Sequence, residues 1–266
     1  MKTNRIPLIT TVLVLLFFYF PLIWMVLQSF LGKFDGRYEW TLKWYDQVFH
    51  KHEVLMAVSN TIVVGLTASV ISTVLGTLSA LAIFKYRSKL QELHTGLLYI
   101  PLVLPEILMG LSLLIFFSGM GLPFGKGTVI AAHVAFCTSY VTVVIASSLD
   151  GFDFTLVEAS RDLGATYFQT FRKVIFPLLR PAICAGALLA FTLSLDDFIV
   201  TFFVSGHGGT TLPVYIYNSL KHGKVPGLYA LSSALLAVTF LLVTVSLVFT
   251  KNQQLLEGSD EKNRKK

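Results

Sequence analysis

The chain has 266 residues, of which 54% are hydrophobic and 14% are charged, and its mean hydropathy is +0.70. This composition excludes an ordinary soluble domain and indicates that lipid is the solvent of most of the chain. The net charge of +6 does not predict a nucleic-acid partner, because most Lys and Arg residues flank long apolar runs.

Six apolar runs follow one another along the chain. A helix needs about 20 mostly apolar residues to cross a bilayer, because hydrocarbon cannot satisfy an open backbone amide. We therefore predict an all-α, polytopic membrane protein with one domain over residues 1–266. Its expected transmembrane helices cover residues 6–31, 57–84, 96–118, 128–149, 182–204 and 228–250. The first run is too long for the apolar part of a signal peptide, so we expect it to be retained.

The distribution of basic residues predicts the orientation of these spans. If the N-terminus lies inside, 14 of the 21 Lys and Arg residues fall in inner segments. Cytoplasmic loops retain such residues. The expected location is thus a bacterial inner membrane, with both termini in the cytoplasm.

The outer segment from Lys33 to Glu53 is longer than a hairpin between two spans requires. It contains Trp40, Trp44 and Tyr45, and rings of this kind anchor at the depth of lipid headgroups. We expect either a short interfacial element or a plain outer loop.

Acidic residues interrupt the third and fifth apolar runs. Glu106 follows Pro105 near the middle of the third, and Asp196 and Asp197 lie in the outer half of the fifth. An acid near a helix centre costs about 2.5–3.5 kcal/mol on insertion scales, so it usually faces water or a partner. Prolines kink helices, so we expect space around Glu106. Successive helical residues point about 100° apart, so one Asp is expected to bind and the other to brace.

Three other features have structural explanations. His133 in the fourth run is expected to be a packing residue with satisfied nitrogens, and Gly206–Gly209 to supply a turn. Cys137 and Cys184 lack the spacing of metal ligands, so we predict inert packing and no metal site.

The inner segment 150–180 is too long for a turn and contains no span. Its apolar residues alternate with charges, which predicts short amphipathic helices. It reads Glu158-Ala159-Ser160, then Gly164 four positions on, and ends in Ile175-Phe176-Pro177.

This segment resembles the E-A-A, three residues, G, nine residues, I-x-L-P loop in the permease subunits of binding-protein-dependent ABC importers. The spacing matches completely, with Ser160 for the second Ala, Val174 for Ile and Phe176 for Leu. The resemblance implies a type I ABC importer permease fold, whose cytoplasmic coupling helices fit a cleft in the ATPase. The small Ala159 and Ser160 would allow close approach, and Gly164 a sharp turn. Glu158 is expected in the first turn of the second cytoplasmic helix.

Similarity to one group within that family covers nearly the whole chain. Three segments look like the C-type permease of spermidine/putrescine importers: Leu104–Met109, Phe191–Asp197 and Leu212–Tyr217. The resemblance implies polyamine uptake. It also implies a substrate-binding protein outside, two copies of an ATP-binding subunit, and a second permease that is a different chain.

The chain has no complete phosphate-binding loop of its own. The nearest segment, Met120–Gly127, lacks the first Gly and the final Ser or Thr. We expect a non-catalytic subunit without bound cofactors, with ATP and Mg²⁺ on the partner ATPase.

A polyamine is a flexible cation with several charges, which needs carboxylates along its path and gains from aromatic faces. The predicted substrate pathway therefore contains Glu106, Asp196 and Asp197, with Tyr215 and Tyr217 near the outer mouth.

Two other classes of function remain. A secondary transporter would use the intramembrane carboxylates as ion-coupling sites. An intramembrane protease would need two aspartates from different helices, yet Asp196 and Asp197 are adjacent.

Overall fold

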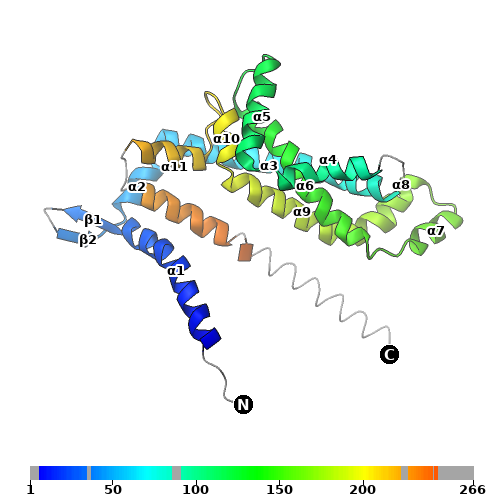
Figure 1. Ribbon diagram of the computed structural model, residues 1–266, viewed down its shortest axis with the longest axis horizontal. Coiled ribbons are helices and arrows are strands. Elements are labelled where there is room, and N and C mark those ends of the chain that lie inside the picture. The colour runs from blue at the N-terminus through cyan, green and yellow to red at the C-terminus, as the bar shows by residue number, and fades with distance from the viewer. Residues whose placement is uncertain (1–5, 35–36, 86–90, 223–226, 242, 245–266) are drawn as a thin grey trace. The chain divides into compact units, whose positions relative to one another are not determined.

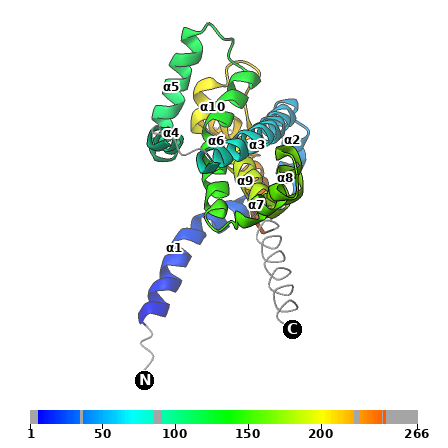
Figure 2. The ribbon, with the colours of Figure 1, turned by 90° about the vertical axis from the view of Figure 1, so that its right-hand side faces the viewer.

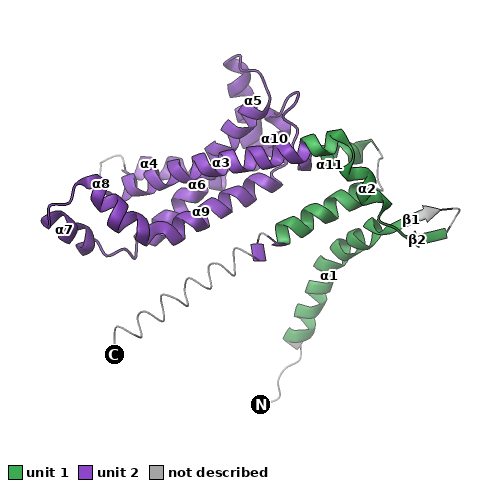
Figure 3. Ribbon diagram, turned by 180° about the vertical axis from the view of Figure 1, so that it is seen from behind, with its two compact units in different colours: residues 1–56, 215–240 green, residues 57–214, 241–266 purple. Residues whose placement is uncertain are grey.

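The computed structural model describes residues 6–34, 37–85, 91–222, 227–241 and 243–244. Almost all of the described regular structure is helical (Figure 1). The chain divides into two compact units, one formed by residues 1–56 and 215–240 and the other by residues 57–214 and 241–266 (Figure 3).

The first unit contains the N-terminal helix and its outer connection. Helix α1 (Ile6–Ser29) leads into a hairpin of β1 (Leu31–Phe34) and β2 (Arg37–Trp40), in which Leu31 pairs with Trp40, and then into α2 (Lys43–Phe49). Tyr45 shares a 2.7 Å hydrogen bond with Ser29, and Trp44 donates to the Leu31 carbonyl. The long outer segment thus contains a small folded element, which favours the first of the two expectations above.

The second unit is a helical bundle around α6 (Lys126–Leu149). Against α6 lie α3 (His52–Lys85) and α9 (Phe176–Asp196), as two perpendicular views show (Figures 1 and 2). Close approach depends on small residues, because a Cβ on Gly76 or Gly186 would meet Val141. Ser69 of α3 also donates to the Ala187 carbonyl of α9 at 2.7 Å. Small residues and interhelical hydrogen bonds are the usual means of packing helices in lipid.

Among the described residues, four helical segments are each long and apolar enough to cross a membrane: Pro7–Ser29, His52–Lys85, Lys126–Leu149 and Tyr167–Asp196. They coincide with the first, second, fourth and fifth predicted spans, although the last begins well before residue 182. The sixth prediction, 228–250, begins with the apolar helix Gly227–Leu241, and residues 245–250 lie outside the described residues.

The third predicted span, 96–118, is not one straight helix. It consists of α4 (Gln91–Val103) and α5 (Glu106–Gly119), whose axes differ by 109°. The break lies at Leu104–Pro105, where the proline ring disfavours helical geometry in the residue before it and removes an amide donor. Glu106 is therefore the first residue of α5 and not a mid-helix residue.

The fifth predicted span, 182–204, is also interrupted. Helix α9 ends at Asp196, Asp197 has extended backbone angles (φ −61°, ψ 122°), and α10 runs over Ile199–Val204. Before α9, the chain forms a π-helical turn, η1 (Phe171–Ile175). This wide turn lies just before Pro177, which has no amide to donate to the preceding turn.

Candidate functional site

The two helix breaks come together around one cavity. Helix α5 packs closely on α10, since a Cβ on Gly110 would lie 2.7 Å from the ring of Phe203. The cavity beside this contact has a volume of about 590 Å³. Its walls consist of Pro101, Leu102, Leu104, Pro105, Glu106, Met109, Phe136, Tyr140, Leu193, Asp196, Asp197, Phe198 and Ile199.

All three predicted acids therefore line one cavity, which the sequence alone could not establish because Glu106 is 90 residues from Asp196. The side chains of Glu106 and Asp196 are exposed, and neither forms an ion pair with a described residue. Two carboxylates without a neutralising partner create a site of negative potential, which attracts cations.

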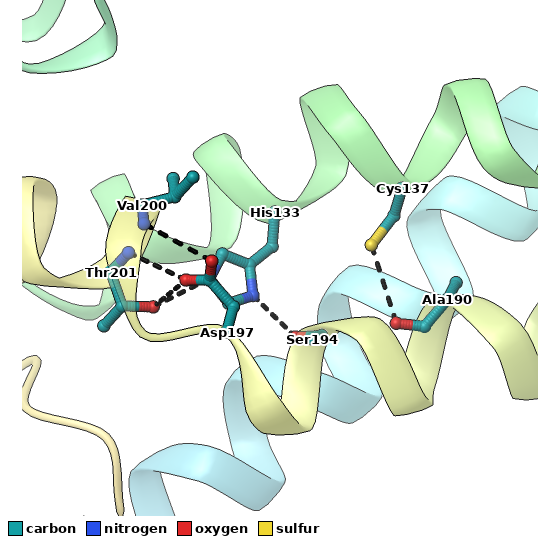
Figure 4. Close-up of polar contacts among 7 residues, drawn as sticks. All are labelled: His133, Cys137, Ala190, Ser194, Asp197, Val200 and Thr201. Atoms are coloured by element: carbon teal, nitrogen blue, oxygen red, sulfur yellow. Dashed lines mark hydrogen bonds and ion pairs between the residues drawn. The ribbon is translucent and has the colours of Figure 1, made fainter. Parts of the chain in front are cut away.

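Asp197 differs from Asp196 because its carboxylate accepts hydrogen bonds from other groups of the protein (Figure 4). It accepts from the amides of Val200 and Thr201 at 3.3 and 2.8 Å and from the Thr201 hydroxyl at 2.7 Å. Its Oδ2 also lies 3.2 Å from Nε2 of His133, and the Asp197 side chain is 7% exposed. A carboxylate on the first amides of α10 satisfies donors that the helix cannot pair internally.

His133 of α6 completes this network, as expected for a satisfied histidine. Its Nδ1 lies 2.6 Å from the hydroxyl of Ser194, and its Nε2 lies 2.9 Å from that of Thr201. All three side chains are buried. Ser194 and Thr201 were not singled out from the sequence, although Thr201 follows Asp197 at the four-residue spacing of one helical turn.

The two tyrosines of the predicted pathway, Tyr215 and Tyr217, lie on α11 (Leu212–Lys221), in the part assigned to the other compact unit. Tyr215 lines a small pocket with Val48, and Tyr217 has the Lys221 ammonium 5.9 Å from its ring centroid. Neither tyrosine lines the carboxylate cavity.

The 150–180 loop folds into two short helices, α7 (Thr155–Asp162) and α8 (Tyr167–Thr170). Gly164 has φ +81° and ends α7 with paired bonds, from its own amide to Arg161 and from the Ala165 amide to Ser160. This motif requires a residue with left-handed backbone angles, which glycine adopts with the least strain. The expected sharp turn at Gly164 is thus present.

Glu158 lies in the first turn of a short helix as expected, but that helix is the first of the loop and not the second. Glu158 and Ala159 are exposed. Ser160 instead faces inward, where its hydroxyl lies 2.9 Å from that of Thr170. Pro177 is in the first turn of α9.

The same loop presents apolar side chains to the outside. Leu163 is 89% exposed and Phe168 is 70% exposed, while Leu156 is about half exposed. Lys85, the last residue of α3, contacts the loop by a cation–π interaction, with its ammonium 4.7 Å from the ring centroid of Tyr167. Arg161, in the loop itself, lies 4.1 Å from the same centroid. A fixed loop with exposed apolar residues has the form of a docking element.

Comparison with known proteins identifies the family. Residues 72–257 match the model of the binding-protein-dependent transport system inner membrane component. The chain belongs to this family. It is therefore a multi-pass inner-membrane permease subunit of a transport system that depends on a binding protein.

The curated relatives cover nearly the whole permease. The spermidine/putrescine transport system permease protein PotC of Shigella flexneri is 34% identical, over 92% of this chain and 94% of that protein. PotC of Haemophilus influenzae is 36% identical over 88% and 92%. The putrescine transport system permease protein PotI of Escherichia coli is 36% identical over 83% and 82%. The predicted resemblance to C-type permeases is confirmed.

Solved structures confirm the ABC importer fold. A bacterial ABC transporter that imports the acidic polysaccharide alginate matches with a TM-score of 0.71 at 16% identity, over 93% of this chain and 94% of that chain. The MetNI methionine ABC transporter matches with a TM-score of 0.60 at 16% identity, over 76% and 98%. These two proteins carry unlike substrates on one fold, so the fold alone does not select the substrate.

Proposed function

We propose that this permease carries polyamines of the spermidine and putrescine class into the cell. The observation that carries the proposal is the pair of carboxylates, Glu106 and Asp196, that line one cavity without a cationic partner among the described residues. PotC and PotI relatives support the same substrate class.

The cavity has the chemistry that a flexible polycation needs. Ammonium groups lose water when they enter it, and the two carboxylates offset that loss. The rings of Phe136, Tyr140 and Phe198 also line the cavity, and aromatic faces attract cations. Asp197 contributes little to binding in this proposal, because its oxygens are already bonded to the protein.

The energy for transport is proposed to enter through the 150–180 loop. With the N-terminus in the cytoplasm, this loop faces the cytoplasm, where Leu163 and Phe168 offer apolar side chains to a groove of the ATPase. Glu158 and Ala159, both exposed on α7, would lie at this interface. ATP and Mg²⁺ would bind to two ATPase subunits, and this chain would supply no catalytic group.

The proposed assembly pairs this chain with a second, different permease, and a binding protein delivers the substrate from outside. Membership of a binding-protein-dependent family opposes the alternative of an ion-coupled secondary transporter.

Uptake by the assembled importer in proteoliposomes tests the proposal. ATP inside the vesicles and binding protein outside should drive uptake of labelled spermidine or putrescine. An excess of unlabelled polyamine should compete, and an anionic or neutral solute should not. Uptake that persists without ATP, or that polyamines do not inhibit, would contradict the proposal.

A further inference from the structure

The structure assigns His133 a positioning role: by holding Asp197 against α6, it directs Asp196 into the cavity. This inference rests on the proposed function for its transport readout, but its geometry is independent of the substrate. In this inference Asp196 faces the substrate, whereas Asp197 is used for hydrogen bonds within the protein.

The hydrogen-bond pattern shows how His133 holds Asp197. An ionised carboxylate can only accept, so the Thr201 hydroxyl donates its single hydrogen to Asp197 at 2.7 Å. That hydroxyl can then only accept from His133, whose Nε2 lies 2.9 Å away. The ring hydrogen on Nε2 is therefore shared between the oxygens of Thr201 and Asp197. Ser194 fixes the orientation of the ring from its other nitrogen.

The network joins three helices, which are also connected to either side of it by the hydrogen bonds of Cys137 to the Ala190 carbonyl and of Thr128 to the Val204 carbonyl. His133 belongs to α6, Ser194 to the last turn of α9, and Thr201 to α10. Asp197 occupies the extended link between α9 and α10 (Figure 4). The imidazole ring therefore holds the ends of both helices at a fixed place on α6.

This anchoring determines where Asp196 points. The carboxylate of Asp197 is drawn toward His133 and the first amides of α10. Asp196 is the preceding residue and the last of α9, and the backbone leaves the helix directly after it, at Asp197 (φ −61°, ψ 122°). Asp196 lies at the cavity wall, exposed, with Glu106 on the same wall. Without His133, the α9–α10 link could turn, and Asp196 would lose its fixed direction.

Substitution of His133 separates positioning from general stability. His133→Ala should raise the KM for spermidine about tenfold, with maximal rate and protein level within twofold of wild type. His133→Gln should restore much of the affinity, because its amide places a donor near the position of Nε2. Ser194→Ala should have a smaller effect in the same direction. Thr138→Val on the same helix, which removes only a bond to the Val134 carbonyl of its own helix, is the matched control.

The decisive comparison repeats His133→Ala in a chain that carries Asp196→Asn. If His133 acts through Asp196, adding His133→Ala to the Asp196→Asn chain should not raise KM above the value of Asp196→Asn alone. An equal rise of KM in both backgrounds, or no rise in either, would overturn the positioning role.

A labelling measurement gives a readout that does not depend on transport. Asp196→Cys, in a chain with Cys137 and Cys184 replaced by Ala, should react with a charged thiol reagent, and His133→Ala should change that rate several-fold. An unchanged rate contradicts the positioning role even if polyamines are carried. A changed rate in an importer that does not carry polyamines would refute only the proposed substrate.

Discussion

Phe84, one residue before the end of α3, stacks on Phe154, the residue before α7, with ring centroids 4.3 Å apart and ring planes inclined by 8°. Phe152 adds a second ring contact to Phe154 at 4.7 Å. The loop that we propose to receive the ATPase is thus joined to the longest described helix of the bundle. We therefore expect movement of the loop to be transmitted to α3 through this ring contact.

Loss of this stack should uncouple transport from ATP hydrolysis. Phe154→Ala removes an aromatic contact worth about 0.5–1.5 kcal/mol beyond its buried area. We expect the number of polyamine molecules carried per ATP to fall several-fold at an unchanged protein level, measured in proteoliposomes. Phe116→Ala, which alters a ring that is 58% exposed on α5, is the control. Equal ratios in the two variants would argue against this route.

Gly164 allows a test that isolates backbone conformation. A Cβ on either Gly164 or Gly151 would meet no atom within 4 Å, but only Gly164 has a left-handed φ, +81°. Gly164→Ala should therefore strain the loop by about 1–2 kcal/mol and reduce coupled uptake, whereas Gly151→Ala should not. Gly164→Pro, whose ring fixes φ near −65°, should abolish coupling. Normal uptake by the proline variant would contradict the docking role of the loop.

The contact of α5 with α10 depends on Gly110. A larger residue there must displace Phe203 and approach the backbone of Val200 within 3.3 Å. Gly110→Leu should lower the temperature of half-aggregation of the detergent-solubilised protein and reduce uptake, since overpacking costs about 1–3 kcal/mol. Gly119→Leu, on the same helix with open space around it, should change neither. A larger loss of thermal stability and uptake in Gly119→Leu than in Gly110→Leu would contradict the observed packing.

Asp153 stabilises the loop by an amount that should not change with pH near neutrality. Hydrogen bonds from the Thr155 hydroxyl and amide lower the pKa of this exposed carboxyl below its usual value of 3.8. A lowered pKa in the folded state adds stability above the unfolded pKa and loses it as pH falls through the folded value. Between pH 6 and 8, Asp153→Ala should therefore reduce protease resistance of the loop by a constant factor. A pH-dependent difference in that range would contradict this assignment.

The sequence predicted the helices well where composition alone determines them. Lipid requires long apolar segments, so α1, α3 and α6 were visible as runs, and the spacing of the 150–180 loop identified the family. It predicted less well where a local interaction ends a helix. The break at Asp197 depends on acceptors for the amides of α10, and the size of the bend at Pro105 depends on packing against α10.

The candidate site shows the same division. That Glu106 and the two aspartates are unusual follows from the cost of charge in lipid. The sequence could not show that His133 and Thr201 hydrogen-bond Asp197 whereas Asp196 remains exposed in the cavity, because this arrangement requires three helix segments to meet in space. The pathway tyrosines remain a prediction, because they belong to the other compact unit.

The KM for spermidine in chains with neutralised acids tests the central claim most directly. Glu106→Gln and Asp196→Asn should each raise KM roughly tenfold, about 1.4 kcal/mol of lost binding. Basal ATP hydrolysis and protein level should remain unchanged. Unchanged KM in both variants, at normal protein levels, would contradict the claim that the two carboxylates bind the transported cation.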